Sequence, residues 1–502
     1  MYRDSTAPNV RRPHGRRPNS FEEPIRRLAA ARSDPGAASE GRCGLSRRHA
    51  AVCVLVAALS TATLPAQSGT SGSTLLVGGT VIDGTGAPPR AGLDVLVIGG
   101  RIAAVGPDAA RRAPEGATRV DVSGRWIIPG LIDGHVHFFQ TGGLDARPDV
   151  VPLPTGRTYL DVVGAIRARP EPYLHSYICA GVTSVVDPGG PMWEFELRDR
   201  RAHDPDAPRI AFSGPLLATA DPPPLELEHD DPIWLMKDEA GIRAMVDRLA
   251  ARRPDMVKIW FVHRRGDDLA AQSALVTAAI REIHARRLRA AVHATTLETA
   301  RVAVDGGADI LVHSVGDREV DDAFVRTVVR RRVIYVPTLI VGRSYREVRL
   351  RRVEFEPFER TCAPSSSIDS FAVLPDIHDS ILPRNPTLGP DPLPVQQRNL
   401  KRLWDAGAIV AAGTDAGNTR TLHGPSLHRE FALMAAAGLT PLQILTSATR
   451  NGAMLFGRED LGGIAPGMQA DLVVLDADPA RDILNTRRIR AVMRGGVLRD
   501  RP

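Results

Sequence analysis

The 502-residue sequence has few cysteines, few aromatic residues and no long apolar run. Its four cysteines are too few for a disulfide-rich scaffold. No stretch approaches the roughly 20 apolar residues of a membrane-spanning helix, so we expect no integral membrane segment in the mature chain. With 43% hydrophobic and 24% charged residues, the chain is neither disordered nor collagen-like. Its length allows two or three structural units.

The excess of positive charge is confined to the beginning of the chain. The formal net charge is +6, and the first 66 residues alone carry 11 arginines against 5 acidic residues. The rest of the chain is therefore formally neutral. This balance gives no reason to expect a nucleic acid partner.

Residues 42–66 have the pattern of a secretory signal peptide. A basic region with Arg47 and Arg48 precedes a short apolar stretch, and small residues lead to a possible cleavage site after Ala66. The arginine pair fits either a twin-arginine or an ordinary Sec signal. We expect an exported protein, periplasmic or secreted, and we interpret residues 1–41 as a disordered extension or a mis-assigned start.

Only two cysteines follow this leader. Cys179 and Cys362 are 183 positions apart and fit no metal-binding spacing. We expect two separate, partly buried thiols, with a disulfide in an oxidising compartment as the alternative.

Both ends of the mature chain have the same β-rich texture. Residues 74–126 and 461–499 consist of short runs rich in Val, Ile and Leu, punctuated by pairs of glycines. Such runs are typical of hairpins. They predict one small β-sandwich domain built from both termini.

Between them, residues 127–460 alternate short apolar strands with amphipathic segments, which is typical of an α/β fold with a parallel sheet. Eight strands at this length favour a (β/α)₈ TIM barrel over an open sheet. The proline-rich segment 341–397 is too long for an ordinary connection and predicts a cap over the barrel mouth. The eight strand candidates are Ile127–His135, Thr183–Asp187, Arg209–Ser213, Met256–Trp260, Ala290–Ala294, Ile310–Ser314, Val333–Leu339 and Ile409–Asp415.

Side chains able to bind metals stand at the ends of several of these strands: His135, His137, His293, His313 and Asp415. The carboxyl ends of all barrel strands meet at one mouth, so these residues would be neighbours. The first two also point to the same side of an extended strand. Singly, each histidine could be a structural hydrogen-bonding residue and the aspartate part of a turn. Together they predict a metal site.

Lysine is almost absent from the chain, which has three among 64 basic residues: Lys237, Lys258 and Lys401. Lys258 lies on an apolar strand candidate. A buried lysine can lose its proton and react as an amine, whereas arginine stays charged. We therefore interpret Lys258 as a carboxylated lysine, whose anionic carbamate bridges two metals. The alternative is a buried ion pair with an acid such as Asp255.

Five motifs in this order resemble the amidohydrolase superfamily. They are PGLIDGHVH at 129–137, MVKIW at 256–260, VHA at 292–294, VHS at 312–314 and GTDAG at 413–417. The resemblance covers nearly the whole mature chain and is strongest to the imidazolonepropionase-related enzymes, in particular the lysine-carboxylated dipeptidase-like subgroup. The stretch 423–430 is also similar to that subgroup. True imidazolonepropionases lack the lysine, which counts against that activity.

The resemblance implies a binuclear metal centre. His135, His137 and Asp415 would hold one ion, His293 and His313 the other, with carboxylated Lys258 shared. Zn²⁺ is the default for such ligands, although Mn²⁺, Fe²⁺ or Co²⁺ would also fit. A hydroxide between the ions would attack the substrate, and Asp415 would be the catalytic proton carrier.

Four further residues near strand ends are candidates for substrate binding: Trp193, His263, Tyr335 and His423. Packing or hydrogen bonding in the scaffold explains each of them equally well. The partner implied is a small-molecule substrate, with a homo-oligomer possible.

The predicted function is an exported, metal-dependent hydrolase of an amide-type C–N bond in a dipeptide, N-acyl amino acid or cyclic amide. A lactone or ester hydrolase would use the same ligands. A heterocycle deaminase is disfavoured because Glu298 stands too far after His293 and because of Lys258. A non-catalytic secreted binding protein is the remaining alternative.

Overall fold

Eight short parallel strands form the centre of the computed structural model, which describes residues 72–149, 151, 158–221, 225, 227–378 and 390–500. The strands are β6 (Leu131–Asp133), β7 (Val182–Asp187), β8 (Arg209–Phe212), β11 (Val257–Trp260), β12 (Ala290–His293), β13 (Ile310–Val312), β14 (Ile334–Val336) and β15 (Ile409–Val410). The predicted extension 1–41 and signal peptide 42–66 lie outside the described residues.

The strands close into a barrel through backbone hydrogen bonds at both seams. They fall into a group β6-β7-β8 and a group β11-β12-β13-β14-β15. The Gly134 N–H donates to the Ala412 carbonyl at 2.8 Å, beside β15, and the Asp255 N–H donates to the Phe212 carbonyl at 3.0 Å, beside β11. The chain therefore has the TIM-barrel type of α/β fold expected from its sequence.

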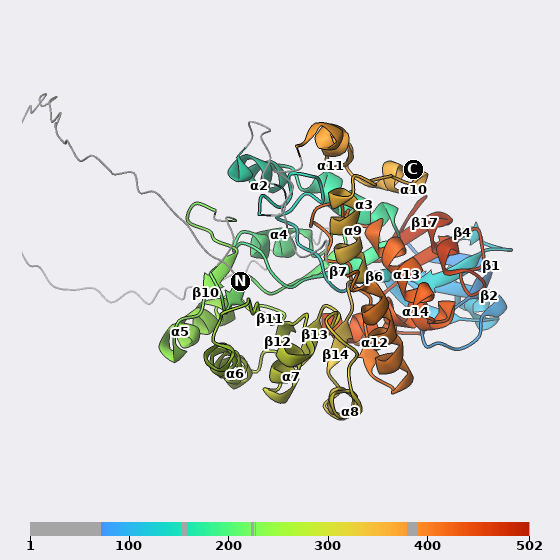
Figure 1. The fold of residues 1–502 in the computed structure, drawn as a ribbon. Coiled ribbons are helices and arrows are strands. Elements are labelled where there is room, and N and C mark those ends of the chain that lie inside the picture. The colour runs from blue at the N-terminus through green and yellow to red at the C-terminus, as the bar shows by residue number, and fades with distance from the viewer. Residues whose placement is uncertain are drawn as a thin grey trace, which may run out of the picture. The chain divides into compact units, whose positions relative to one another are not determined.

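Helices surround this ring of strands, as Figure 1 shows for α5 to α8 and α12. Aspartates start several of them: Asp238, Asp268 and Asp321 each accept a hydrogen bond from the backbone N–H three residues later. Such caps satisfy donors that a helix leaves free at its first turn. The barrel helices are α2 (Tyr159–Ala168), α3 (Glu171–Cys179), α4 (Glu194–Arg201), α5 (Glu239–Ala250), α6 (Leu269–Ala285), α7 (Leu297–Asp305), α8 (Asp322–Arg330), α12 (Leu393–Asp405), α13 (Ser426–Ala436), α14 (Pro441–Ser447) and α15 (Arg450–Phe456).

The alternation of side chains along each strand divides the core into two parts. Ile334 and Val336 of β14 pack in a cluster with Ile310 and Val312 of β13. Tyr335, between the first two, belongs to the larger cluster shared with the surrounding helices. Successive side chains of a strand point to opposite faces, so one set fills the barrel and the other holds the helices.

A second sheet joins the two ends of the described chain, and Figure 1 shows its blue and red strands side by side. Its order is β18-β17-β16-β5-β1-β2-β3, with β4 on β1. The strands are β1 (Thr74–Val81), β2 (Arg90–Ile98), β3 (Arg101–Val105), β4 (Thr118–Asp121), β5 (Trp126–Pro129), β16 (Leu472–Leu475), β17 (Ile489–Arg494) and β18 (Val497–Asp500), and the helix α1 (Asp108–Arg112) accompanies them. The domain boundaries expected from the sequence stay a prediction.

The first predicted strand, Ile127–His135, is in fact two strands. β5 belongs to the terminal sheet and β6 to the barrel. Gly130 separates them at a point where a Cβ would lie 2.0 Å from the Thr183 Oγ1. Only glycine allows this close approach, and the chain changes sheets there.

Short helices occupy much of the predicted cap: α9 (Leu339–Arg349), α10 (Pro357–Cys362), α11 (Ser365–Asp369) and the 3₁₀ helix η1 (Ser370–Asp376). Residues 379–389 of the cap lie outside the described ranges. The Ser367 hydroxyl donates to the Thr141 carbonyl at 2.7 Å, and the Leu144 N–H donates to the Ser370 Oγ at 2.8 Å. These bonds fix the cap to the loop after β6.

The expectation of two separate thiols is wrong, because Cys179 and Cys362 form a disulfide. Cys179 ends α3 and Cys362 ends α10. The Ser176 hydroxyl also donates to the Cys362 carbonyl at 2.7 Å. The barrel folds these distant positions together, which sequence spacing could not reveal. The bridge ties the cap to a barrel helix.

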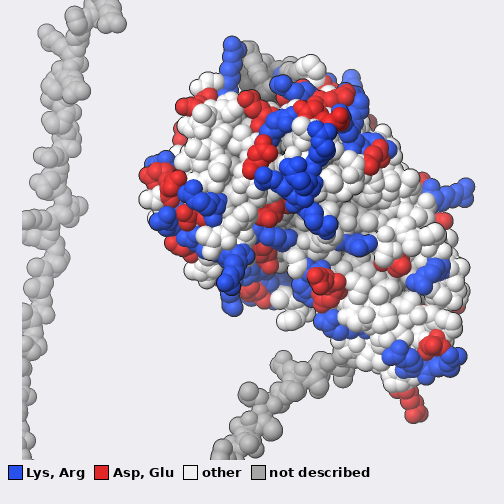
Figure 2. All heavy atoms as spheres, turned by 90° about the horizontal axis from the view of Figure 1, so that it is seen from below, with Lys and Arg blue, Asp and Glu red and all other residues white. Residues whose placement is uncertain are grey.

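The surface mixes both signs of charge. Figure 2 shows acidic and basic side chains interspersed over one face. Across the described ranges, no helix combines the length and apolar character needed to cross a membrane.

Candidate active site

A cavity of about 290 Å³ lies at the carboxyl ends of the barrel strands. It is lined by all six predicted metal-site residues, namely His135, His137, Lys258, His293, His313 and Asp415. They lie on or shortly after five strands, β6, β11, β12, β13 and β15, and the first and last are 280 positions apart in sequence. The closed barrel brings them together, as their strand-end positions predicted.

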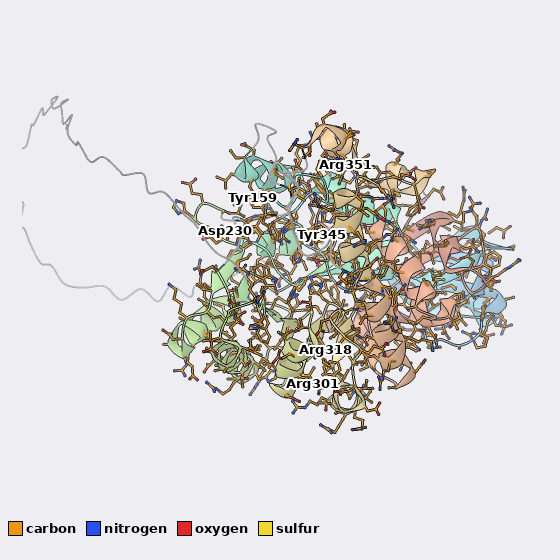
Figure 3. The ribbon with its side chains drawn as sticks, in the orientation of Figure 1. Tyr159, Asp230, Arg301, Arg318, Tyr345 and Arg351 are labelled. Atoms are coloured by element: carbon orange, nitrogen blue, oxygen red, sulfur yellow. A yellow bond between two sulfur atoms is a disulfide. The ribbon has the colours of Figure 1, made fainter. Side chains whose placement is uncertain are left out.

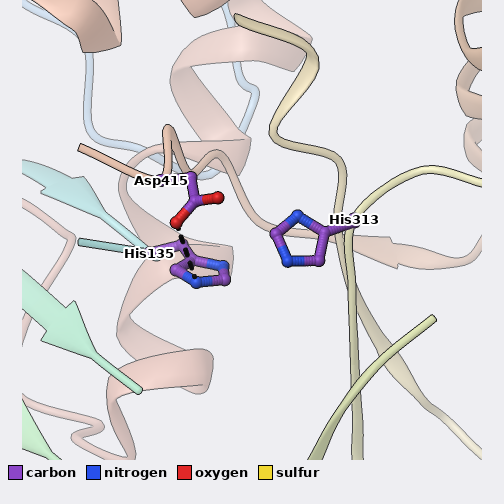
Figure 4. A group of neighbouring side chains, drawn as sticks. All are labelled: His135, His313 and Asp415. Atoms are coloured by element: carbon purple, nitrogen blue, oxygen red, sulfur yellow. Dashed lines mark ion pairs between the residues drawn. The ribbon is translucent and has the colours of Figure 1, made fainter. Parts of the chain in front are cut away.

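Two histidines and an aspartate form the tightest part of the group. The Nε2 atoms of His135 and His137 are 3.2 Å apart. The Asp415 Oδ1 lies 3.4 Å from the former and 3.1 Å from the latter. Figure 4 shows Asp415 beside His135, with His313 facing them. Ligand atoms of His135, His313 and Asp415 all lie within 4.8 Å of one another, close enough to hold one ion.

Hydrogen bonds orient two of the imidazoles toward this group. The His137 Nδ1 bonds the Gly189 carbonyl at 2.6 Å, and the His313 Nδ1 bonds the Thr338 hydroxyl at 2.7 Å. In each ring the Nε2 is then left for the cavity. A partner on the far nitrogen is usual for metal-binding histidines because it fixes the ring. His293 completes the set, with its ring centroid 4.4 Å from that of His313.

Burial keeps most of these imidazoles neutral. It lowers the pKa of His135 and His293 well below the usual range and that of His313 to about 3. Burial alone would lower the pKa of His137 too, but Asp187 and Asp415 raise it to about 9. Neutral imidazole is the form that binds a cation, so this pocket suits metal ligands.

The backbone is strained at the mouth of three successive strands. His313, Thr338 and Asp415 have φ of 74°, 45° and 64°, in the left-handed region that non-glycine residues rarely adopt. Each such residue costs on the order of 1–3 kcal/mol and persists only where the surrounding structure enforces it. The strain turns these side chains toward the cavity.

Lys258 is 1% exposed and lies on β11. Burial lowers the pKa of its amine to about 7, although the carboxylates of Asp415 and Asp187 oppose this shift. The alternative partner, Asp255, is engaged elsewhere. Its carboxylate accepts from the Phe212 N–H at 2.8 Å and lies 3.2 Å from the Arg198 guanidinium.

Sequence reasoning did not assign a role to two buried acids, Asp133 and Asp187. Asp133 accepts from the Thr414 hydroxyl at 2.7 Å and from the His135 N–H at 3.3 Å, which joins the first strand to the last. Asp187 accepts from the Phe138 N–H at 2.8 Å. The sequence did carry a signal for both acids. Asp133 stands two residues before His135, and Asp187 is the last residue of a strand, β7. They hold the ligand loops in place.

The four predicted substrate residues lie outside the walls of the cavity. Tyr335 points into the layer between strands and helices. His263 is exposed and bonds the Gln272 side chain at 2.8 Å. Trp193 is buried at the start of α4, where its backbone N–H donates to the Asp230 carboxylate at 3.2 Å. His423 is buried beside Tyr177 and behind the lining residue Gln140.

Loop residues that the sequence did not single out line the cavity instead. The Arg147 guanidinium donates to the Asn418 Oδ1 at 2.7 Å, and the Tyr345 hydroxyl donates to the same oxygen at 2.6 Å. Arg147 also forms a bidentate pair with Asp149. Figure 3 shows Tyr345 near the centre of the molecule, whereas Arg301 lies toward its edge. Irregular loops have no periodicity that would mark these residues.

Comparison with known proteins gives one consistent family. The pattern of the amidohydrolase family matches residues 126–499. The imidazolonepropionase of Streptomyces avermitilis is 27% identical over 411 residues, covering 76% of this chain and 80% of that protein. The enzyme of the same name from Mycolicibacterium smegmatis is also 27% identical, with 76% and 84% covered.

Solved structures share the fold. A Xaa-Pro dipeptidase with methionine bound in its active site superposes with a TM-score of 0.65 at 21% identity, covering 86% of this chain and 100% of that one. A putative prolidase from Bifidobacterium longum gives 0.64 at 22% identity, with 86% and 95% covered.

Proposed function

The chain belongs to the amidohydrolase family and acts as a hydrolase on carbon–nitrogen bonds, and from that premise we propose that it is an exported enzyme using two divalent cations to cleave an amide-type bond. Its substrate would be a dipeptide, an N-acyl amino acid or a cyclic amide. The observation that carries this proposal is the convergence of four imidazoles, a carboxylate and a buried amine on one cavity of about 290 Å³.

The donor set suits a pair of divalent cations. Imidazole nitrogen and carboxylate oxygen are typical ligands of Zn²⁺. His135, His137 and Asp415 would hold one ion, and His293 and His313 the other. When bound, the cations supply an activated water and polarise the scissile carbonyl.

Asp415 is suited to carry the proton in this reaction. Its burial would raise the carboxyl pKa, but His135 and His137 hold it well below its usual range. The carboxylate therefore stays ionised and can accept a proton from the attacking water. It then returns that proton to the leaving nitrogen, so that the amine departs neutral.

Lys258 would link the two ligand groups as a carbamate. A neutral amine is the form that attacks CO₂, and burial favours that form at neutral pH. The new N–C bond forms as one N–H proton passes to water, which leaves an anionic carboxylate on the lysine. Such a carboxylate would supply the oxygen ligands that both cations could share.

Deamination of a heterocycle receives no support from the site. Glu298, the acid that follows His293, is exposed on the first turn of α7. Export rests on the leader pattern of residues 42–66 and agrees with a disulfide in the mature chain.

Metal analysis of lysine variants tests the proposal. We expect the purified protein to contain two metals per chain, to hydrolyse members of a panel of dipeptides, N-acyl amino acids and cyclic imides, and to lose activity with chelators. Lys258→Arg should lose bound metal and turnover, because a guanidinium cannot form the carbamate.

Lys401→Arg is the matched control. Lys401 is partly exposed on α12, paired with Asp405 and outside the cavity lining, so the same substitution should change neither property. A Lys258→Arg protein that keeps two metals and full turnover would contradict the carbamate. Two bound metals without hydrolysis of any amide in the panel would contradict the proposed activity.

A further inference from the structure

One wall of the cavity is an apolar patch built from three adjacent strands. β9 (Leu216–Ala218) pairs in parallel with β10 (Ile233–Leu235) on one side and with β11 on the other. Leu216 is opposite Ile233, and Ala218 is opposite Trp260. Because side chains alternate along a strand, Ile233, Leu216 and Trp260 share one face. All three line the cavity.

This patch lies against the proposed ligands. The ring centroid of Trp260 is 6.3 Å from that of His293. Leu216 packs on Gly189, where a Cβ would come within 2.5 Å of the Leu216 Cγ. Gly189 is also the residue whose carbonyl holds His137. A group resting on the patch is therefore next to both histidine pairs.

Other lining residues of the cavity are polar and are largely hydrogen-bonded to one another. Arg147 is bonded to Asp149 through two nitrogens and to Asn418 through a third, and Tyr345 donates to Asn418. Besides the six proposed metal-site residues, the cavity is thus lined by an apolar group on β9 to β11 and by polar side chains that already have partners.

On the basis of the proposed function, we propose that the face formed by Ile233, Leu216 and Trp260 binds an apolar substituent of the substrate beside the scissile C–N bond. The substrate class is then an amide carrying a branched aliphatic or aromatic group. A charged or amide-bearing group would lose its hydration there without gaining a partner from these three side chains. Ile233, on β10, is the specificity-determining residue.

Two inhibitors that differ only in one side chain test the preference of this face for an apolar group, and they do so without measuring turnover. The hydroxamates of leucine and asparagine share a metal-binding group and have side chains of nearly equal size. We expect the metal-loaded protein to bind the leucine compound at least about tenfold more tightly in calorimetry, as burial of a leucine side chain predicts. Ile233→Asn should reduce this ratio toward one, mainly by weakening the leucine compound.

Trp234→Asn is the control, on the same strand but on the face that points away from the cavity, and it should keep the ratio. Equal affinities of the two compounds, no binding of the leucine compound, or an unchanged ratio in Ile233→Asn would each overturn the inference. Equal loss of the preference for the leucine compound in Trp234→Asn would also overturn it. A protein that shows the preference but hydrolyses no amide would refute the proposed function, whereas the apolar binding face itself would stand.

Discussion

His423 shows how a single residue can support the site without lining it. The Tyr177 hydroxyl and the His423 Nδ1 are 2.8 Å apart, and the His423 Nε2 bonds the Gln140 carbonyl at 2.7 Å. The ring also stacks on Phe138. It therefore fixes the loop that follows the His135 and His137 pair.

This arrangement makes stability depend on pH. Burial lowers the pKa of His423 to about 4, although the bond to Gln140 opposes the shift. Between about pH 6.5 and 4 the unfolded chain binds more protons than the folded one, so the free energy of unfolding should fall as the pH falls. The contribution of His423 is complete above pH 6.5 and amounts to about 3 kcal/mol over this window.

His423→Gln removes the titrating group and can keep both hydrogen bonds. We expect its unfolding free energy, measured by denaturant titration from pH 7 to 4, to fall less steeply than that of the native chain. His263→Gln changes an exposed imidazole and serves as the control. Parallel curves for the native chain and His423→Gln would contradict this account.

At the scale of elements, α9 shows how a helix of the cap is coupled to the site. Its N-cap residue, Thr338, makes no side-chain cap, because its hydroxyl bonds the His313 Nδ1. Glu430 of α13 takes over that role. Its carboxylate accepts from the Leu339 N–H at 2.9 Å and from the Ile340 N–H at 2.7 Å.

Removing the Glu430 carboxylate should therefore destabilise the fold. Glu430→Ala leaves two buried N–H donors without an acceptor, and we expect the unfolding free energy to fall by about 2–5 kcal/mol. Glu430→Gln retains one acceptor oxygen, so its unfolding free energy should lie between those of the native protein and Glu430→Ala. Glu459→Ala, at an exposed position, should change little in the same denaturant titration. An unaltered Glu430→Ala protein would show that water or another group replaces the cap.

At the scale of the whole molecule, the disulfide links the barrel to its cap. Cys179 and Cys362 enclose more than a third of the chain, and both sulfurs belong to buried residues. The cap in turn holds the loop after β6 through Ser367 and Ser370. The bridge is thus connected to the loop that supplies Arg147 to the cavity.

Loss of the bridge should lower stability by about 2–4 kcal/mol. We expect Cys179→Ser/Cys362→Ser to unfold at a lower denaturant concentration than the native protein. A reductant should have the same effect on the native protein and none on the double variant. Equal midpoints for native and variant proteins would contradict a stabilising role of the disulfide.

The sequence alone was sufficient to predict the barrel type, the family and the six residues that meet in the cavity. These follow from local patterns: apolar runs of strand length, and chemically distinctive side chains directly after them. In parallel strands of a closed sheet, equal positions become neighbours whatever their separation in the chain. His135 and Asp415 could therefore be placed together without coordinates.

Other features needed the tertiary structure. The split at Gly130, the Cys179–Cys362 bridge and the polar wall of Arg147, Tyr345 and Asn418 depend on how loops and sheets pack in three dimensions. Such contacts join positions with no shared periodicity, so no local pattern encodes them. The sequence determined which groups meet in the cavity, whereas packing between distant segments decided which side chains surround them.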